Sequence, residues 1–151
     1  MSDLDDVRRL AQALIDEHLP TGWVFAYDHA RRRAGATHFT HRRITLSRHL
    51  TARYDDATNH QTLLHEIAHA LVGPEVGHGR AWLAAARRLG YTGGVRHSGE
   101  AAVELARWVG TCPAGHVLHR FRRPTRELSC GRCSRRFDRA HLVVWSERPP
   151  A

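Results

Sequence analysis

The hydrophobic and polar positions of this chain follow the period of a helix in three stretches. Residues 3–19 place apolar side chains three and four positions apart, and Pro20 follows as a stop. Residues 57–72 repeat this spacing before a Gly-Pro pair, and residues 79–89 show it again before a glycine. The pattern therefore predicts three helices, and we expect the second to be buried on one side.

Strand-like alternation fills the space between the first two helices. Residues 22–28 alternate in polarity, as expected for a half-buried strand. Residues 36–39 and 42–47 read as two further strands joined by a turn, and a short helix follows Ser47. Residues 99–110 read as either a helix or a strand. The order of helix, three strands and then helices predicts an α+β fold.

The composition fits one globular domain with a small appendage. The chain has 151 residues, 42% of them hydrophobic, and no apolar run approaches the roughly 18 residues of a membrane span. Its first six residues are acidic and lack the basic and then apolar layout of a secretion signal. We therefore expect a monomeric, cytoplasmic protein with no membrane contact.

Charge changes this picture for one part of the chain. All 23 basic residues are arginine, as a GC-rich coding sequence favours, but they are unevenly distributed. Residues 111–151 hold nine arginines and three acidic residues, a net charge of +6, whereas the whole chain carries +8. A segment this basic attracts phosphate groups, which favours nucleic acid as its partner.

An H-E-x-x-H run lies inside the helix predicted over residues 57–72. Its two histidines, His65 and His69, are four positions apart and share a helix face, so both imidazoles can bind one metal ion. Glu66 lies beside them, placed to take a proton from a metal-bound water. The run predicts a zinc-dependent hydrolase, most often a peptidase, with Glu66 as its catalytic base.

A catalytic zinc needs a third protein ligand, and two candidates follow the run. His78 stands between two glycines, which let the backbone fold back close to the metal, and Glu75 lies on the exit turn of the helix. The metzincin pattern would need a histidine six residues after His69 and a later Met-turn. His78 is nine residues on and Met1 is the only methionine, so that class is excluded. We prefer His78 and keep Glu75 as the alternative.

These residues resemble the SprT-like metallopeptidase family, which includes the Spartan proteases. The resemblance covers about residues 4–145 and is carried by the segments Thr62–Leu71, Gly77–Gly79 with Trp82, Trp23, Arg31–Gly35 and Ile44–Ser47. In that family the third zinc ligand is the histidine of a G-H-G segment, which corresponds to His78. The resemblance also implies zincin-like helices, which we expect to pack on a small antiparallel sheet.

The three cysteines all fall in the basic segment. Cys130 and Cys133 form a C-x-x-C turn, and Cys112 has His116 four residues on. Three cysteines cannot pair internally, and this spacing fits a closed Cys₃His structural zinc site. His119 and, less favourably, His141 compete with His116. We expect a zinc ribbon over residues 111–148, after a metallopeptidase domain over residues 1–110, and the resemblance also implies a C-terminal zinc module.

The predicted ribbon is the candidate nucleic-acid surface. Arginine binds phosphates through a planar fork, and aromatic rings can stack on unpaired bases. The residues that we assign to such contacts are Arg120, Arg122, Arg123, Arg126, Arg135, Arg136 and Trp145. We expect Phe121 and Phe137 to fill the small core of the module instead.

The resemblance implies proteolysis of DNA-bound and DNA-crosslinked proteins, with DNA as an activator. This predicts a role in DNA repair, association with the nucleoid, and single-stranded or junctional DNA as the partner. Two zinc ions per chain are expected, one catalytic and one structural. A peptidase unrelated to DNA and a non-enzymatic nucleic-acid module remain as alternatives. Tyr91, Arg96 and His97 are the candidates for stabilising the oxyanion.

Overall fold

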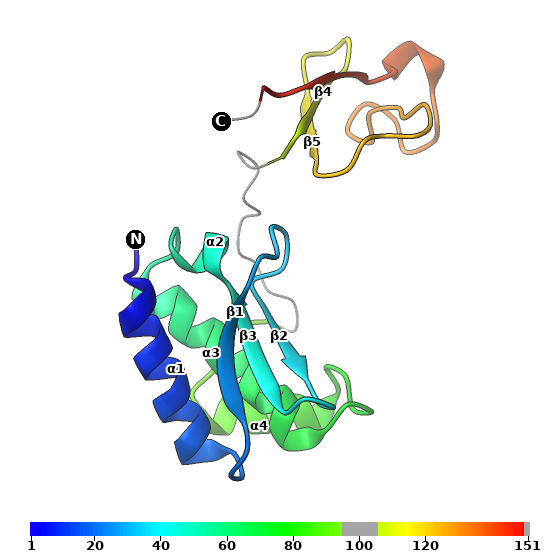
Figure 1. Ribbon diagram of the computed structural model, residues 1–151. Helices are drawn as coiled ribbons and strands as arrows, with labels where there is room; N and C mark the ends of the chain where they lie inside the picture. Colours follow the sequence, from blue (N-terminus) through cyan, green and yellow to red (C-terminus); the bar gives the residue numbers. More distant parts are fainter. Residues whose placement is uncertain (95–105, 150–151) are drawn as a thin grey trace. The chain divides into compact units, whose positions relative to one another are not determined.

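A computed structural model of the chain describes residues 1–94 and 106–149. The contacts divide the chain into two units, Met1–Ala101 and Ala102–Ala151, each with a sheet of its own (Figure 1). The domain boundary predicted between residues 110 and 111 falls within strand β4 (Trp108–Thr111), which belongs to the second sheet. Within the described ranges, no helix is long and apolar enough to cross a membrane.

The first unit has the predicted order of helix, three strands and further helices. Its elements are α1 (Leu4–His18), β1 (Val24–Asp28), β2 (Gly35–His38), β3 (Arg43–Ser47), α2 (Arg48–Thr51), α3 (Asp56–Val72) and α4 (Arg80–Arg88). Each predicted helix and strand of this unit is therefore confirmed to within about two residues at either end, and the fold is α+β.

The first sheet is mixed, so the prediction of an antiparallel sheet is wrong for one of its two pairings. β3 lies in the centre, antiparallel to β2 and parallel to β1. In the sequence β2 follows β1, but in the sheet the two strands lie at opposite edges. The short turn between β2 and β3 then places β3 between them. Alternating polarity predicts strands but carries no information about which strands are neighbours.

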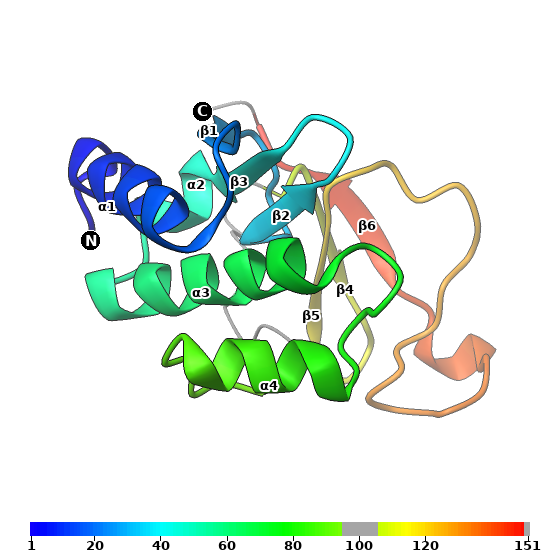
Figure 2. The ribbon, with the colours of Figure 1, turned by 90° about the horizontal axis from the view of Figure 1, so that it is seen from below.

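Helix α3 is the centre of the first unit. Leu63 and Ile67 are fully buried against α1 and the sheet, while Leu64 and Ala68 are buried against α4. Figure 2 shows α3 between the sheet and α4. Asp55 caps the helix by accepting a 2.7 Å hydrogen bond from the Thr58 N–H. Because both sides are packed, the position and rotation of α3 are fixed.

The second unit is built on an antiparallel sheet with the strand order β5-β4-β6, where β5 is Val117–Arg120 and β6 is Val144–Glu147. Gly110 of β4 leaves room for the side chains of Val143 and Trp145, because an added Cβ would lie 2.4 Å from Val143 Cγ1 and 2.8 Å from the Trp145 ring. Phe121 is half-buried, but Phe137 is 57% exposed, so the expected core role of Phe137 is wrong. The small core is instead made of Cys112, Cys130 and Val143, with Leu118, Cys133 and Trp145 packed against them.

Replacing Ile67 with alanine should lower the free energy of unfolding of the first unit by about 3 kcal/mol, because it leaves a cavity beneath the sheet. Urea denaturation followed by helical circular dichroism measures this loss. Leu71→Ala is the matched control on the same helix; its side chain is 44% exposed, and we expect a change below about 0.5 kcal/mol. Equal losses for both variants would contradict the packing described for α3.

Candidate metal centres

Three histidines converge at the C-terminal end of α3. His65 and His69 lie one turn apart on this helix, and His78 comes from the turn that precedes α4. Their Nε2 atoms are 3.3 Å (His65–His69), 3.0 Å (His69–His78) and 3.1 Å (His65–His78) apart. Nitrogens bound tetrahedrally to one zinc ion would be about 3.4 Å apart. The three imidazoles therefore fit a single zinc ion with a fourth position left over.

The backbone of the loop between α3 and α4 determines which residue lies close enough to be the third metal ligand. Gly73 and Gly77 adopt positive φ angles of 90° and 57°, which turn the chain back towards α3. His78 is brought among the potential metal-binding atoms, whereas Glu75 is exposed and lies outside that group. The geometry thus favours His78 over Glu75.

Trp82 of α4 supports the three imidazoles from below. It is fully buried, stacks on His69 at 5.4 Å, and meets His65 and His78 at 4.7 Å each. Its indole N–H donates to the main-chain carbonyl of His65 at 3.3 Å. One side chain thereby restrains all three candidate ligands.

The protonation state of His69 suits a metal ligand. Burial, with a smaller contribution from His78, lowers the pKa of His69 to about 4. At neutral pH this imidazole is therefore uncharged, which is the form that binds metal.

Glu66 lies next to the histidines on the side of the sheet. Its side chain is buried, with 8% exposed, and its Oε2 accepts a 2.9 Å hydrogen bond from the Thr37 hydroxyl of β2. Burial raises the pKa of Glu66 to about 7, although the Thr37 hydrogen bond and the Arg33 charge act in the opposite direction. A carboxyl group with a pKa near neutrality is well suited to accept and return a proton.

A cavity of about 370 Å³ opens above this cluster and is lined by the three histidines and Glu66. Arg32, Arg33 and Tyr54 also line it. Sequence reasoning missed all three as site residues, because the arginines lie on the β1–β2 loop and Tyr54 follows α2, far from the H-E-x-x-H run. The Arg31–Arg33 run was a visible signal, but without the sheet topology nothing connected it to the site.

Tyr91, one of the three expected oxyanion donors, does not line this cavity. Tyr91 is buried beside His65 and Trp82, and its hydroxyl donates to the main-chain carbonyl of Gly94 at 2.8 Å. Arg96 and His97 lie outside the described residues.

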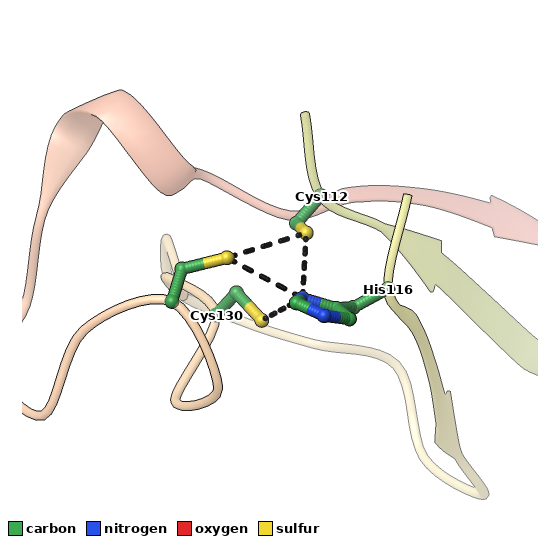
Figure 3. Close-up of side chains that lie close together, drawn as sticks. Cys112, His116 and Cys130 are labelled. Carbon is green, nitrogen blue, oxygen red and sulfur yellow. Dashed lines mark hydrogen bonds between the residues drawn. The ribbon is translucent and has the colours of Figure 1, made fainter. Parts of the chain in front are cut away.

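The cysteine cluster of the second unit has the geometry of a closed zinc site (Figure 3). The His116 Nδ1 atom lies 3.6, 3.5 and 3.4 Å from the sulfurs of Cys112, Cys130 and Cys133, and Cys112 and Cys133 sulfurs are 3.8 Å apart. A tetrahedral zinc site would give about 3.6 Å for sulfur to nitrogen and about 3.8 Å between sulfurs. The donor set and its spacing therefore fit zinc.

The chain around Cys130 favours the thiolate that zinc requires. Burial raises the pKa of this thiol, but the backbone N–H groups of Cys133 and Arg132 outweigh it and lower the pKa to about 6. The two competing histidines lie outside the cluster. Since Leu118 packs against the cysteines, the next residue of β5, His119, points to the opposite face, and His141 is paired with Asp138 at 3.0 Å.

Three arginines of the second unit line a hollow next to two aromatic rings. A cavity of about 470 Å³ is lined by Trp108, Phe121, Arg122 and Arg123, together with Arg107 and Glu147. The Arg123 guanidinium lies 5.7 Å from the centre of the Trp108 ring.

The other residues assigned to nucleic acid lie elsewhere on this unit. Trp145 is half-buried on Gly110, with its indole nitrogen covered, and Arg120 lies 5.8 Å from its ring. Arg126, Arg135 and Arg136 are exposed but do not line the cavity. Trp108, which the sequence did not single out, lies beside the arginines because β4 pairs with β5.

The helix-borne histidine pair, the third histidine and the buried glutamate define a zinc metallopeptidase-type domain. The SprT-like family matches residues 7–104, and the chain belongs to this family. The family resemblance seen in the sequence is thereby confirmed. No curated protein and no solved structure matches the chain significantly.

The two clusters should bind two zinc ions per chain, and each should be lost separately. We expect His78→Ala to lower the zinc content measured by mass spectrometry from two ions to one, and Cys130→Ala to remove the other ion. Cys130→Ala should also unfold the second unit, because the cysteines form much of its core. Glu75→Ala is the control and should keep both ions. A loss of zinc from Glu75→Ala, with zinc retained in His78→Ala, would assign the third ligand to Glu75.

Proposed function

We propose that this protein is a zinc-dependent endopeptidase that cleaves proteins held on DNA. The observation that carries the peptidase assignment is the buried Glu66 carboxyl beside three convergent imidazole nitrogens. Zinc held by these three histidines would lower the pKa of a bound water towards about 7 and would polarise the scissile carbonyl.

Glu66 is the group that moves the proton. Its carboxylate takes a proton from the attacking water while the water oxygen bonds to the carbonyl carbon of the peptide. It then passes this proton to the amide nitrogen as the carbon–nitrogen bond breaks, which releases a carboxylate and an amine. Burial supports this cycle, because a pKa of about 7 lets the same group accept and donate near neutral pH.

The second unit supports the choice of DNA-held substrates. Arg122 and Arg123 surround a hollow whose walls include the Trp108 ring, an arrangement suited to a phosphate and an unpaired base. Nucleic acid bound there would keep the protease near proteins on the same strand. Such tethering raises the effective concentration of substrate without requiring a specific sequence at the cleavage site.

Glu66→Gln should abolish cleavage and leave zinc bound, because the amide cannot accept the proton but has nearly the same shape. We expect at least a roughly 100-fold loss of kcat on a protein substrate, with the zinc content unchanged. Glu17→Gln makes the same chemical change at an exposed site on α1 and should have the activity of the wild type. Wild-type activity of Glu66→Gln would refute the assignment, and the absence of zinc-dependent cleavage by the wild type would favour a non-enzymatic module.

The combined Arg122→Gln and Arg123→Gln variant should bind single-stranded DNA more weakly and with less salt dependence. Two lost phosphate contacts should reduce the slope of log K against log salt by about 1.4, as measured by fluorescence anisotropy. The matched control, Arg9→Gln with Arg88→Gln, removes the same charge from exposed positions of the first unit and should leave the slope unchanged.

Cleavage of a protein substrate by the wild type should also rise when DNA is added and fall when the salt concentration is raised. A cleavage rate that responds to neither would indicate a peptidase unrelated to DNA.

A further inference from the structure

The side chain of Glu66 is seated against the edge strand β2, where two residues touch it. The Thr37 hydroxyl oxygen lies 2.9 Å from Glu66 Oε2. At Gly35, an added Cβ would lie 2.9 Å from Glu66 Cγ and 3.0 Å from Oε1. Gly35 and Thr37 are two positions apart and therefore share one face of the strand. On this face of β2, the Thr37 hydroxyl and the backbone of Gly35 both contact the side chain of Glu66.

The Thr37 hydroxyl has one hydrogen and two acceptors within reach. Besides Oε2, the main-chain oxygen of Glu66 lies 2.9 Å away. The main-chain contact ties β2 to α3 at the turn that carries the H-E-x-x-H run. The contact with Oε2 restrains the rotation of the carboxylate, and the other oxygen, Oε1, faces the backbone of Gly35.

The register of β2 against β3 is fixed by residues of the hydrophobic core. Thr37 is paired with Ile44 of β3 and Gly35 with Leu46. Ile44 and Leu46 are both buried and belong to the same hydrophobic cluster as Ile67 of α3. The distance between the inner face of β2 and Glu66 is therefore set by packing, as the precise placement of a catalytic group requires.

We propose that Thr37 is a positioning residue for the general base, and that Gly35 is glycine because any side chain there would displace Glu66. This inference rests on the proposed function of Glu66. It assigns to β2 a role in the orientation of the carboxylate that is separate from its role in the sheet.

Thr37→Val removes the hydroxyl and keeps the shape of the side chain. We expect a fall in kcat of about tenfold, with an unchanged KM and unchanged zinc content, because the base is misoriented while binding is intact. Thr37→Ser restores the hydroxyl and should recover most of kcat. Thr40→Val is the matched control at an exposed position just after β2 and should behave as the wild type. Equal defects in Thr37→Val and Thr37→Ser, or an unchanged kcat in Thr37→Val, would overturn the inference.

Gly35→Ala tests whether a side chain at this position displaces Glu66. Crystal structures test the contacts between β2 and Glu66 independently of activity. We expect Gly35→Ala to bind zinc, to lower kcat, and to show Glu66 displaced from β2. In Thr37→Val the Glu66 carboxylate should rotate away from its wild-type position, and an unmoved carboxylate in both variants would overturn the inference. If the wild type shows no zinc-dependent cleavage, the proposed function fails, while these structures still decide whether β2 positions Glu66.

Discussion

The convergence of three imidazole nitrogens within 3.3 Å of one another is the constraint on which the first unit depends. Such a cluster can be held only if the rings are uncharged and their backbone cannot move apart. Burial keeps the pKa of His69 low, and Trp82 packs against all three rings. Helix α3 cannot shift because it is packed on the sheet side and on the α4 side. The packing of the apolar core thus holds the three histidines in place.

In the second unit, a similar arrangement of donor atoms would stabilise the fold. A short chain segment cannot bury enough apolar surface to be stable alone, and its core consists largely of Cys112, Cys130 and Val143. A zinc ion bound by three thiolates and His116 would supply the missing stability. The first site leaves one coordination position for chemistry, whereas four protein donors in the second leave none. The two sites therefore differ in role because they differ in the number of protein donors.

The chemistry of the first site depends on residues that are far apart in the sequence. Glu66 receives its hydrogen bond from Thr37, across the space between α3 and β2. The lining of the cavity is completed by Arg32 and Arg33 from the β1–β2 loop and by Tyr54, which follows α2. Burial raises the pKa of Glu66, and the same side chain contacts Thr37 and Gly35 of β2.

Local spacing in the sequence determined the helices and strands, the His65–Glu66–His69 set and the C-x-x-C turn. These features depend on residues within one or two turns of one another, so the chain itself carries the signal. Only the tertiary structure decided that β3 lies parallel to β1, that Trp108 rather than Trp145 borders the arginine-lined hollow, and that Phe137 is exposed. It also decided that Thr37 and Gly35 meet Glu66. Each of these depends on which distant segments pack together, a choice made by the shape of the whole core and not by any local period of the sequence.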